Sequence, residues 1–124
     1  MSEERLRAVR GAIQVSSDDA LIIEDAVRRL CGKLFDQNQL ITNESAVSIM
    51  FTQTNDLTAL NPATALRKAF PTVRIPLFCM QEPSIVGMLP MTIRIMIQFY
   101  APDEEPIQHV YLDGARRLRP DLLD

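Results

Sequence analysis

The stretch that decides the fold is Met91-Thr92-Ile93-Arg94-Ile95-Met96-Ile97-Gln98-Phe99-Tyr100. Large apolar residues alternate through it with polar or flexible ones, and this period of two residues predicts a β-strand with one buried face. Arg94 lies inside the strand. Because a guanidinium is always charged, leaving it dry without an anionic partner is costly. The stretch therefore predicts a strand, and Arg94 within it predicts a site for an anion.

Four more strands and two helices are expected around this strand. Apolar and β-branched residues predict strands over Leu6–Val15, Ala46–Thr54, Val73–Met80 and Ile107–Leu112. Ser16-Ser17-Asp18-Asp19, with a capping hydroxyl and acids in the first turn, predicts the start of a helix that runs to about Asn38. Asn61 as cap and Pro62 at the first helical position predict a second helix, which ends near Ala69 or Phe70.

Spacing within the first helix predicts which residues face the core. A stripe at helical period consists of Ile23, Val27, Leu30 and Leu34. On the wet face, the spacing predicts ion pairs of Glu24 with Arg28 and of Asp25 with Arg29. Three segments are expected between or after these elements: a loop over Pro83–Pro90, an exposed turn over Ala101–Pro106 and a tail over Arg116–Asp124.

The order of these elements is β-α-β-α-β, followed by two strands. It predicts an α+β fold in which the helices pack on one face of the sheet. The 124 residues favour a single domain, 1–124. The second face of the sheet has no element to cover it, so self-association is expected.

Composition excludes several classes of function. The net charge of −3 and pI near 5.1 argue against general binding to nucleic acid or to anionic membranes. No stretch is long and apolar enough for a transmembrane helix, and the acidic N-terminus does not resemble a signal peptide. Cys31 and Cys79 lack the spacing of a metal site and are expected to be reduced thiols, which favours a cytoplasmic location.

Few residues are available for acid–base, nucleophilic or metal chemistry. His109 is the only histidine, so any triad would depend on it, and we expect a structural role for it. No HxH, HExxH or CxxC spacing occurs, and the four glycines form no phosphate-binding motif. An enzyme with this sequence is expected to work without a metal or cofactor.

Arginine dominates the basic residues, with eleven arginines against two lysines. Four of them lie within or at the ends of expected elements: Arg10, Arg67, Arg94 and Arg119. Glu82, Cys79 and Tyr111 are their polar companions. The alternative for each arginine is a pair with an acid in the core or at a subunit contact. Glu82 is open to two interpretations, as a substrate ligand or as an ion-pair partner. Together the four favour a pocket for a small, multiply charged anion.

Five strings in these regions resemble a known family. They are Val9-Arg10-Gly11-Ala12, Cys79-Met80-Gln81-Glu82, Ile93-Arg94, His109-Val110-Tyr111-Leu112 and Leu118-Arg119-Pro120-Asp121-Leu122. In this order and spacing, with Asp56-Leu57-Thr58-Ala59 and Pro62-Ala63 between them, the chain resembles the monofunctional chorismate mutases of the trimeric pseudo-α/β-barrel type. The resemblance extends from about Leu6 to Leu122 and implies a five-stranded mixed sheet with two helices.

What the resemblance implies is a cofactor-free isomerase of the shikimate pathway. Members of the family rearrange chorismate to prephenate, towards phenylalanine and tyrosine, by a unimolecular Claisen shift. By resemblance, Arg94 is the catalytic cation for the ether oxygen and one substrate carboxylate. Arg10 and Tyr111 bind the side-chain carboxylate, and Glu82 with Cys79 binds the ring hydroxyl.

The resemblance also implies a set of surrounding residues and a homotrimer with active sites at the subunit interfaces. Arg67 and Arg119 are expected near the entrance, and the wall is expected to include Leu118, Ala63 and Phe78. Asn61, Thr64 and Phe78 depart from the family pattern, which leaves substrate affinity less defined than reaction type. Two alternatives stay open at this point: a trimeric imine-deaminase-like enzyme and a non-catalytic module that binds an aromatic-pathway metabolite.

Overall fold

A computed structural model describes residues 3–122 as five strands, two α-helices and two short 3-10 helices. In chain order these are β1 (Glu4–Gln14), α1 (Ala20–Gln37), β2 (Ala46–Gln53), α2 (Pro62–Ala69), β3 (Leu77–Gln81), β4 (Thr92–Pro102), β5 (Val110–Leu112), η1 (Asp113–Arg117) and η2 (Pro120–Leu122). The strands form one sheet in the order β3-β2-β4-β1-β5. Strand β4 is central and antiparallel to both neighbours, whereas β5 and β3 are parallel to β1 and β2. The expected α+β fold with a five-stranded mixed sheet is confirmed.

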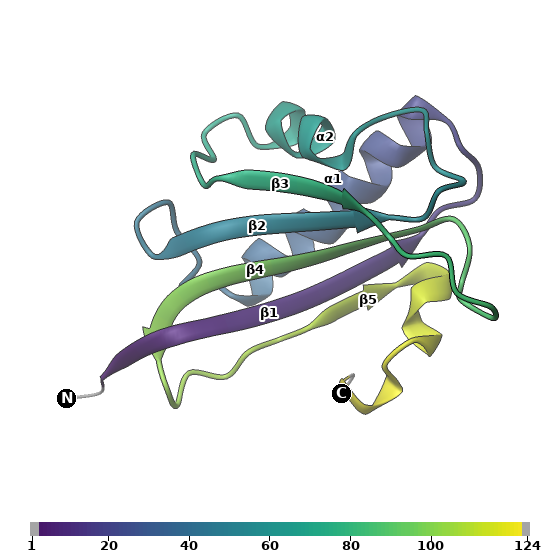
Figure 1. The fold of residues 1–124 in the computed structure, drawn as a ribbon. Helices are drawn as coiled ribbons and strands as arrows, with labels where there is room; N and C mark the ends of the chain where they lie inside the picture. Colours follow the sequence, from purple (N-terminus) through teal and green to yellow (C-terminus); the bar gives the residue numbers. More distant parts are fainter. Residues whose placement is uncertain (1–2, 123–124) are drawn as a thin grey trace.

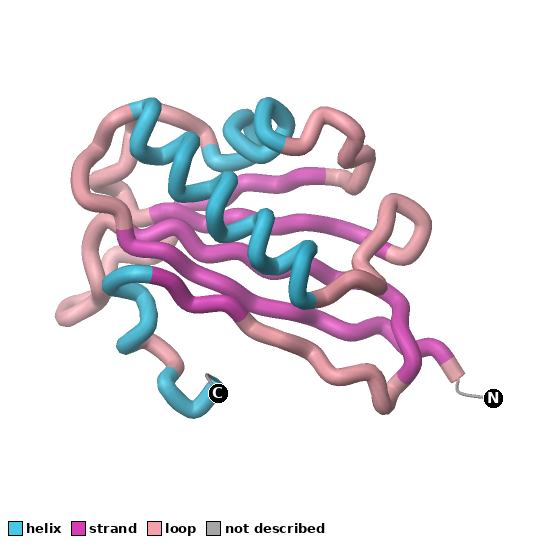
Figure 2. Tube along the Cα trace, turned by 180° about the vertical axis from the view of Figure 1, so that it is seen from behind, coloured by secondary structure: helices cyan, strands magenta, loops and turns pink. Residues whose placement is uncertain are grey.

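Both α-helices cover the same face of the sheet, and the other face is left open (Figures 1 and 2). The 3-10 helices follow β5 at one edge of the sheet. Neither α-helix within residues 3–122 combines the length and apolar composition that crossing a bilayer requires. We call the two sides of the sheet the helix-covered face and the open face.

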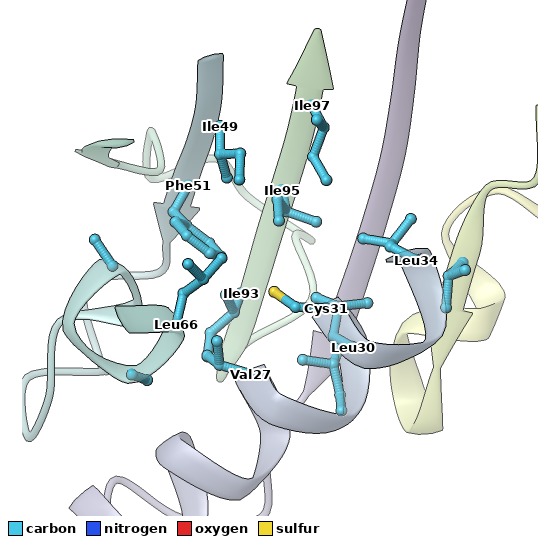
Figure 3. Close-up of a cluster of buried hydrophobic side chains, with 14 of the residues drawn as sticks. Val27, Leu30, Cys31, Leu34, Ile49, Phe51, Leu66, Ile93, Ile95 and Ile97 are labelled. Atoms are coloured by element: carbon cyan, nitrogen blue, oxygen red, sulfur yellow. The ribbon is translucent and has the colours of Figure 1, made fainter. Parts of the chain in front are cut away.

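The helix-covered face holds the main core. Figure 3 shows the isoleucines of β4 directed toward α1 and α2. Fully buried members of this cluster are Val27, Leu30, Leu34, Ile49, Phe51, Leu66, Ile93 and Ile97. The four-residue stripe predicted for α1 is buried throughout, so both the strand period and the helix period identified core positions correctly.

The helix starts follow two different capping side chains. At α2, the Asn61 side chain accepts a hydrogen bond from the Ala63 N–H, 2.8 Å away, and Pro62 follows it, as predicted. At α1 the cap is the carboxylate of Asp19, which accepts from the N–H groups of Leu21 and Ile22. The prediction of a capping hydroxyl with acids in the first turn was therefore wrong, because the chain reaches helical conformation only after Asp19.

Two strands are shorter than predicted. In each case, an asparagine side chain accepts the backbone hydrogen bond that a neighbouring strand would otherwise accept. Before β3, the Arg74 N–H donates to Oδ1 of Asn43 at 2.8 Å, so Val73 to Pro76 stays irregular. Before β5, the Gln108 N–H donates to Oδ1 of Asn38 at 2.9 Å. Because these groups are satisfied by side chains, β5 begins at Val110 rather than Ile107.

Two further predictions were wrong. Strand β4 continues through Ala101 and Pro102, where an exposed turn was expected, because the Ala101 side chain is buried against the core. On α1, Arg28 pairs with Asp25, Glu24 pairs with Lys68 of α2, and Arg29 pairs with Asp113 of η1. Partners from neighbouring elements therefore displace two of the expected helix-surface pairs.

Candidate active site

The open face carries a cavity of about 290 Å³ to which all five strands contribute. Its lining consists of Arg10 and Gly11 from β1, Met50 and Thr52 from β2, Met80 from β3, Arg94, Ile95 and Met96 from β4, Tyr111 from β5, and Arg119. Alternation along the strands explains most of this membership, since residues two apart project from the same face of a sheet, while Gly11 and Ile95 lie between the open-face residues of their strands. Three arginines that lie far apart in the sequence thus meet at one place.

Arg94 lies at the centre of this cavity because β4 is the central strand. Its cross-strand neighbours are Ala12 on β1 and Thr52 on β2, and both are small enough to leave space above the sheet. Nε of Arg94 is buried, and among the described residues it has no hydrogen-bond acceptor. The side chain as a whole is 40% exposed, so its outer part is open to the cavity. A buried N–H without an acceptor calls for a partner that residues 3–122 do not supply.

Glu82 is the carboxylate beside Arg94. Its Oε1 lies 3.5 Å from Nε of Arg94, close enough for an ion pair but without hydrogen-bond alignment. The Thr52 hydroxyl donates a short hydrogen bond to the same oxygen, and the Glu82 N–H donates to the Gln53 carbonyl at 2.8 Å. Glu82 is therefore held at the end of β3 by β2. Of the two interpretations left open by the sequence, the structure gives the ion pair with Arg94.

Arg10 is held through its backbone. Its N–H donates to Nδ1 of His109 at 3.0 Å, in the position where a strand neighbour would otherwise accept. This bond requires the neutral imidazole. Burial, followed by the positive charges of Arg10 and Arg119, lowers the pKa of His109, which favours that form. Among residues 3–122, the Arg10 guanidinium has no carboxylate within ion-pair distance.

Strand β5 brings Tyr111 to the cavity, and the C-terminal turns bring Arg119. Tyr111 is buried with Ala12 and Ala115, and Leu118 packs against this small cluster. Arg119 pairs with Asp121 through two contacts, of 3.0 and 2.7 Å, and this hydrogen-bonded pair lowers the pKa of Asp121 and raises that of Arg119. The three guanidiniums of Arg10, Arg94 and Arg119 outnumber the two carboxylates that pair with them, those of Glu82 and Asp121. The cavity therefore keeps an excess of positive charge, which suits an anionic ligand.

Four predicted site residues lie elsewhere in the chain. Ala63 and the exposed Arg67 belong to α2, on the helix-covered face. Cys79 borders a second cavity with Gln53 and Asn61, and burial raises the pKa of its thiol. Phe78 lies on the open face at the edge strand and is 61% exposed. Within one chain, none of the four lines the arginine cavity.

Sequence reasoning missed the apolar part of the lining. Met50, Met80 and Met96 surround the arginines, and Thr52 orients Glu82. The signal was present in the alternation of β2, β3 and β4, where these residues share the face of Arg94. Flexible methionine side chains are suited to walls that contact a ring-shaped ligand.

A larger cavity, of about 620 Å³, lies between α1 and η1. Its only arginine is Arg29, which Asp113 already neutralises with two hydrogen bonds. Size alone would favour this cavity, but convergent, incompletely paired charge is the better indicator of a site for an anion. We therefore take the arginine cavity as the candidate active site.

A family model, two curated relatives and a solved structure to which this chain is similar are all chorismate mutases. The family model for chorismate mutase type I matches residues 6–122. The chorismate mutase AroH of Thermus thermophilus is 37% identical over 118 residues, covering 94% of this chain and 96% of the relative. That of Bacillus subtilis is 35% identical over 119 residues, covering 94% and 92%. A solved chorismate mutase from Clostridium thermocellum superposes with a TM-score of 0.80 at 35% identity, covering 90% of this chain and 98% of that structure.

Proposed function

Since the chain belongs to the chorismate mutase type I family, we propose that its arginine cavity is where chorismate is isomerised to prephenate. The family assignment supports a chorismate mutase of aromatic amino acid biosynthesis over the imine-deaminase and binding-module alternatives. The observation that carries the location is the meeting of Arg10, Arg94 and Arg119 on the open face, with Nε of Arg94 lacking an acceptor.

The reaction explains why fixed cations are sufficient. In the Claisen rearrangement the ether C–O bond breaks while a new C–C bond forms, and negative charge grows on the ether oxygen. No proton needs to move. A guanidinium already in position meets that charge without reorganising, and this stabilises the transition state more than the bound substrate. Arg94 is the residue proposed for this role, because it occupies the central strand and has an unpaired donor.

The other groups are proposed to bind and orient the substrate. Arg10, together with Tyr111, takes the side-chain carboxylate, and Arg119 closes over the anion beside Leu118. Holding the carboxylates in place folds the flexible side chain over the ring and lowers the entropic part of the barrier. Glu82, whose Oε1 lies 3.5 Å from Nε of Arg94, is proposed to accept a hydrogen bond from the ring hydroxyl and to keep Arg94 oriented. The methionines supply apolar contacts to the ring.

A homotrimer is proposed to complete the site. The open face exposes Leu6, Phe78, Met80 and Tyr100 by at least 40% each, which is a large apolar area for a monomer to leave in water. Arg67, Ala63 and Cys79 lie away from the cavity of their own chain, so they reach a substrate only if they belong to a neighbouring subunit's cavity. Sedimentation at micromolar concentration tests this: a trimer is expected, and a monomer would contradict the shared site.

The decisive experiment follows the absorbance of chorismate with wild-type protein and with Arg94 replaced by citrulline, its neutral isostere. We expect kcat to fall by about 10²–10³, corresponding to the removal of one preorganised donor for developing charge. The fold is expected to persist, since Arg94 points away from the core. Near-native kcat in the citrulline variant would refute the role of Arg94.

A further inference from the structure

The turn between β5 and η1 is held by an ion pair with α1, the helix on the sheet face opposite the arginine cavity. Nη1 and Nη2 of Arg29, on α1, donate to the two carboxylate oxygens of Asp113 at 3.0 and 3.1 Å. The two residues are 84 positions apart in the sequence. A two-point contact of this kind fixes the plane of the carboxylate as well as its position. This contact joins the helical layer to the C-terminal turns.

Asp113 has an unusual backbone conformation. Its φ is +55°, in the left-handed region that non-glycine residues seldom adopt, although aspartate tolerates it better than most. At the next residue, Gly114, an added Cβ would lie 1.6 Å from Oε1 of Gln14, so a side chain there would require the Gln14 side chain to move. A residue in this conformation persists only where its surroundings impose it. The two hydrogen bonds from Arg29 are such a constraint on Asp113.

This turn sets the direction of the segment that reaches the active site. Asp113 begins η1, Ala115 is fully buried against Tyr111, and the Leu118 N–H donates to the Ala115 carbonyl at 3.0 Å. Arg119, which lines the cavity, comes next in the chain. A rotation at Asp113 would therefore move Leu118 and Arg119 together.

We propose that Arg29 is a positioning residue for Arg119, acting through Asp113 from the far side of the sheet. The hydrogen bonds from Arg29 hold the pKa of Asp113 below its usual value, which keeps the carboxylate charged and the contact intact. Arg29 is itself anchored, because Ala26 and Leu30 beside it on α1 are buried in the core. The inference rests on the proposed function, since it assigns Arg119 to the binding of the substrate.

Steady-state kinetics separates this role from a purely structural one. Arg29→Ala and Asp113→Asn are expected to raise KM about fivefold, the size of effect that an exposed ion pair provides, with kcat changed less than twofold. Asparagine also tolerates a positive φ, so Asp113→Asn isolates the ion pair from the backbone conformation. Arg28→Ala is the matched control, because its partner Asp25 lies on the same helix. Arg29→Lys should recover part of the loss.

A double-mutant cycle gives the sharper result. In an Arg119→Ala background, Arg29→Ala is expected to have no further effect on KM, because the two residues act through one contact. Equal losses in both backgrounds, equal falls in kcat and kcat/KM, or no change at all would overturn the proposal.

A measurement without substrate keeps the two proposals distinguishable. Amide hydrogen exchange at Leu118 is expected to quicken in Arg29→Ala and to stay at the wild-type rate in Arg28→Ala. Unchanged exchange would overturn the inference even if chorismate is turned over. Faster exchange in a protein that leaves chorismate untouched would support the positioning of Arg119 and refute only the proposed function.

Discussion

The two faces of the sheet use the same strands for opposite purposes. On the helix-covered face, Ile93, Ile95 and Ile97 of β4 are almost completely buried against apolar neighbours. On the open face, Arg94 and Met96 of the same strand border a cavity whose charges are incompletely paired. The apolar groups of the first face are buried within the chain, whereas the second face leaves Nε of Arg94 without an acceptor among residues 3–122. Function is to be sought on the face whose interactions a single chain leaves unfinished.

The largest expected effect comes from truncating two adjacent residues of β4 whose side chains lie on opposite faces of the sheet. Phe99 is 1% exposed on the helix-covered face, and Tyr100 beside it is 47% exposed on the open face. Phe99→Ala should lower the free energy of unfolding by about 3–5 kcal/mol, through lost burial and a cavity. Tyr100→Ala should change it by about 0.5 kcal/mol or less. Denaturant titration measures both, and similar losses would show that the open face is not a separate layer.

A smaller loss of unfolding free energy is expected at Gly11, where α1 and two strands approach the same backbone position. Gly11 lies between β4, β5 and α1, and an added Cβ would lie 2.8 Å from the Val110 carbonyl oxygen. Gly11→Ala should therefore cost about 1–3 kcal/mol in unfolding free energy. It should also reduce turnover, because a shift of β5 displaces Tyr111.

Gly32→Ala is the matched control for this substitution. Its new Cβ meets only Phe70 at 3.7 Å, an ordinary contact, so this variant should gain about 0.4–1 kcal/mol. If the two glycine variants behaved alike in denaturant titrations, close approach at Gly11 would not be the reason for that residue.

The smallest effect concerns the imidazole behind Arg10. His109→Leu leaves the Arg10 N–H without its acceptor and should cost about 1 kcal/mol at neutral pH. Because the folded-state pKa of His109 lies below its ordinary value of 6.5, the unfolded chain binds the proton more readily. The stability that neutral His109 contributes is present above that value and is lost as pH falls through the folded-state pKa.

His109→Asn provides the control for this pH dependence. Its amide oxygen can accept from the Arg10 N–H but does not titrate. Unfolding measured at about pH 8 and about pH 5 should show a smaller acid-dependent loss in the asparagine variant than in the wild type. An identical pH dependence would mean that other groups are responsible.

Local patterns predicted the helix-covered face well, because it obeys two simple periods. The alternation of β4 and the stripe of α1 depend only on residues a few positions apart. The ends of β3 and β5 were predicted too long, because acceptors from distant positions take their N–H groups. Asn43 does this before β3, and Asn38 does it before β5. No local pattern contains those partners.

The site shows the same division. The family resemblance pointed to Arg10, Arg94, Tyr111 and Arg119, and the structure gathers these four around one cavity, while their roles stay predictions. The partner of Arg29 was assigned wrongly, because helix spacing favoured Asp25 and the fold supplies Asp113. Ion pairs between elements depend on topology, which the spacing of charges along one helix does not encode.

The close alternation on β4 has a consequence for how the chain can misfold. If β4 paired with its neighbours in a register shifted by one residue, the isoleucine side chains would face solvent and Arg94 would face the apolar core. Such a slip would disrupt the core and the proposed catalytic cation in the same event. A register-shifted form would therefore be too unstable to accumulate as folded, inactive protein. The activity of a preparation should then be proportional to its amount of folded protein.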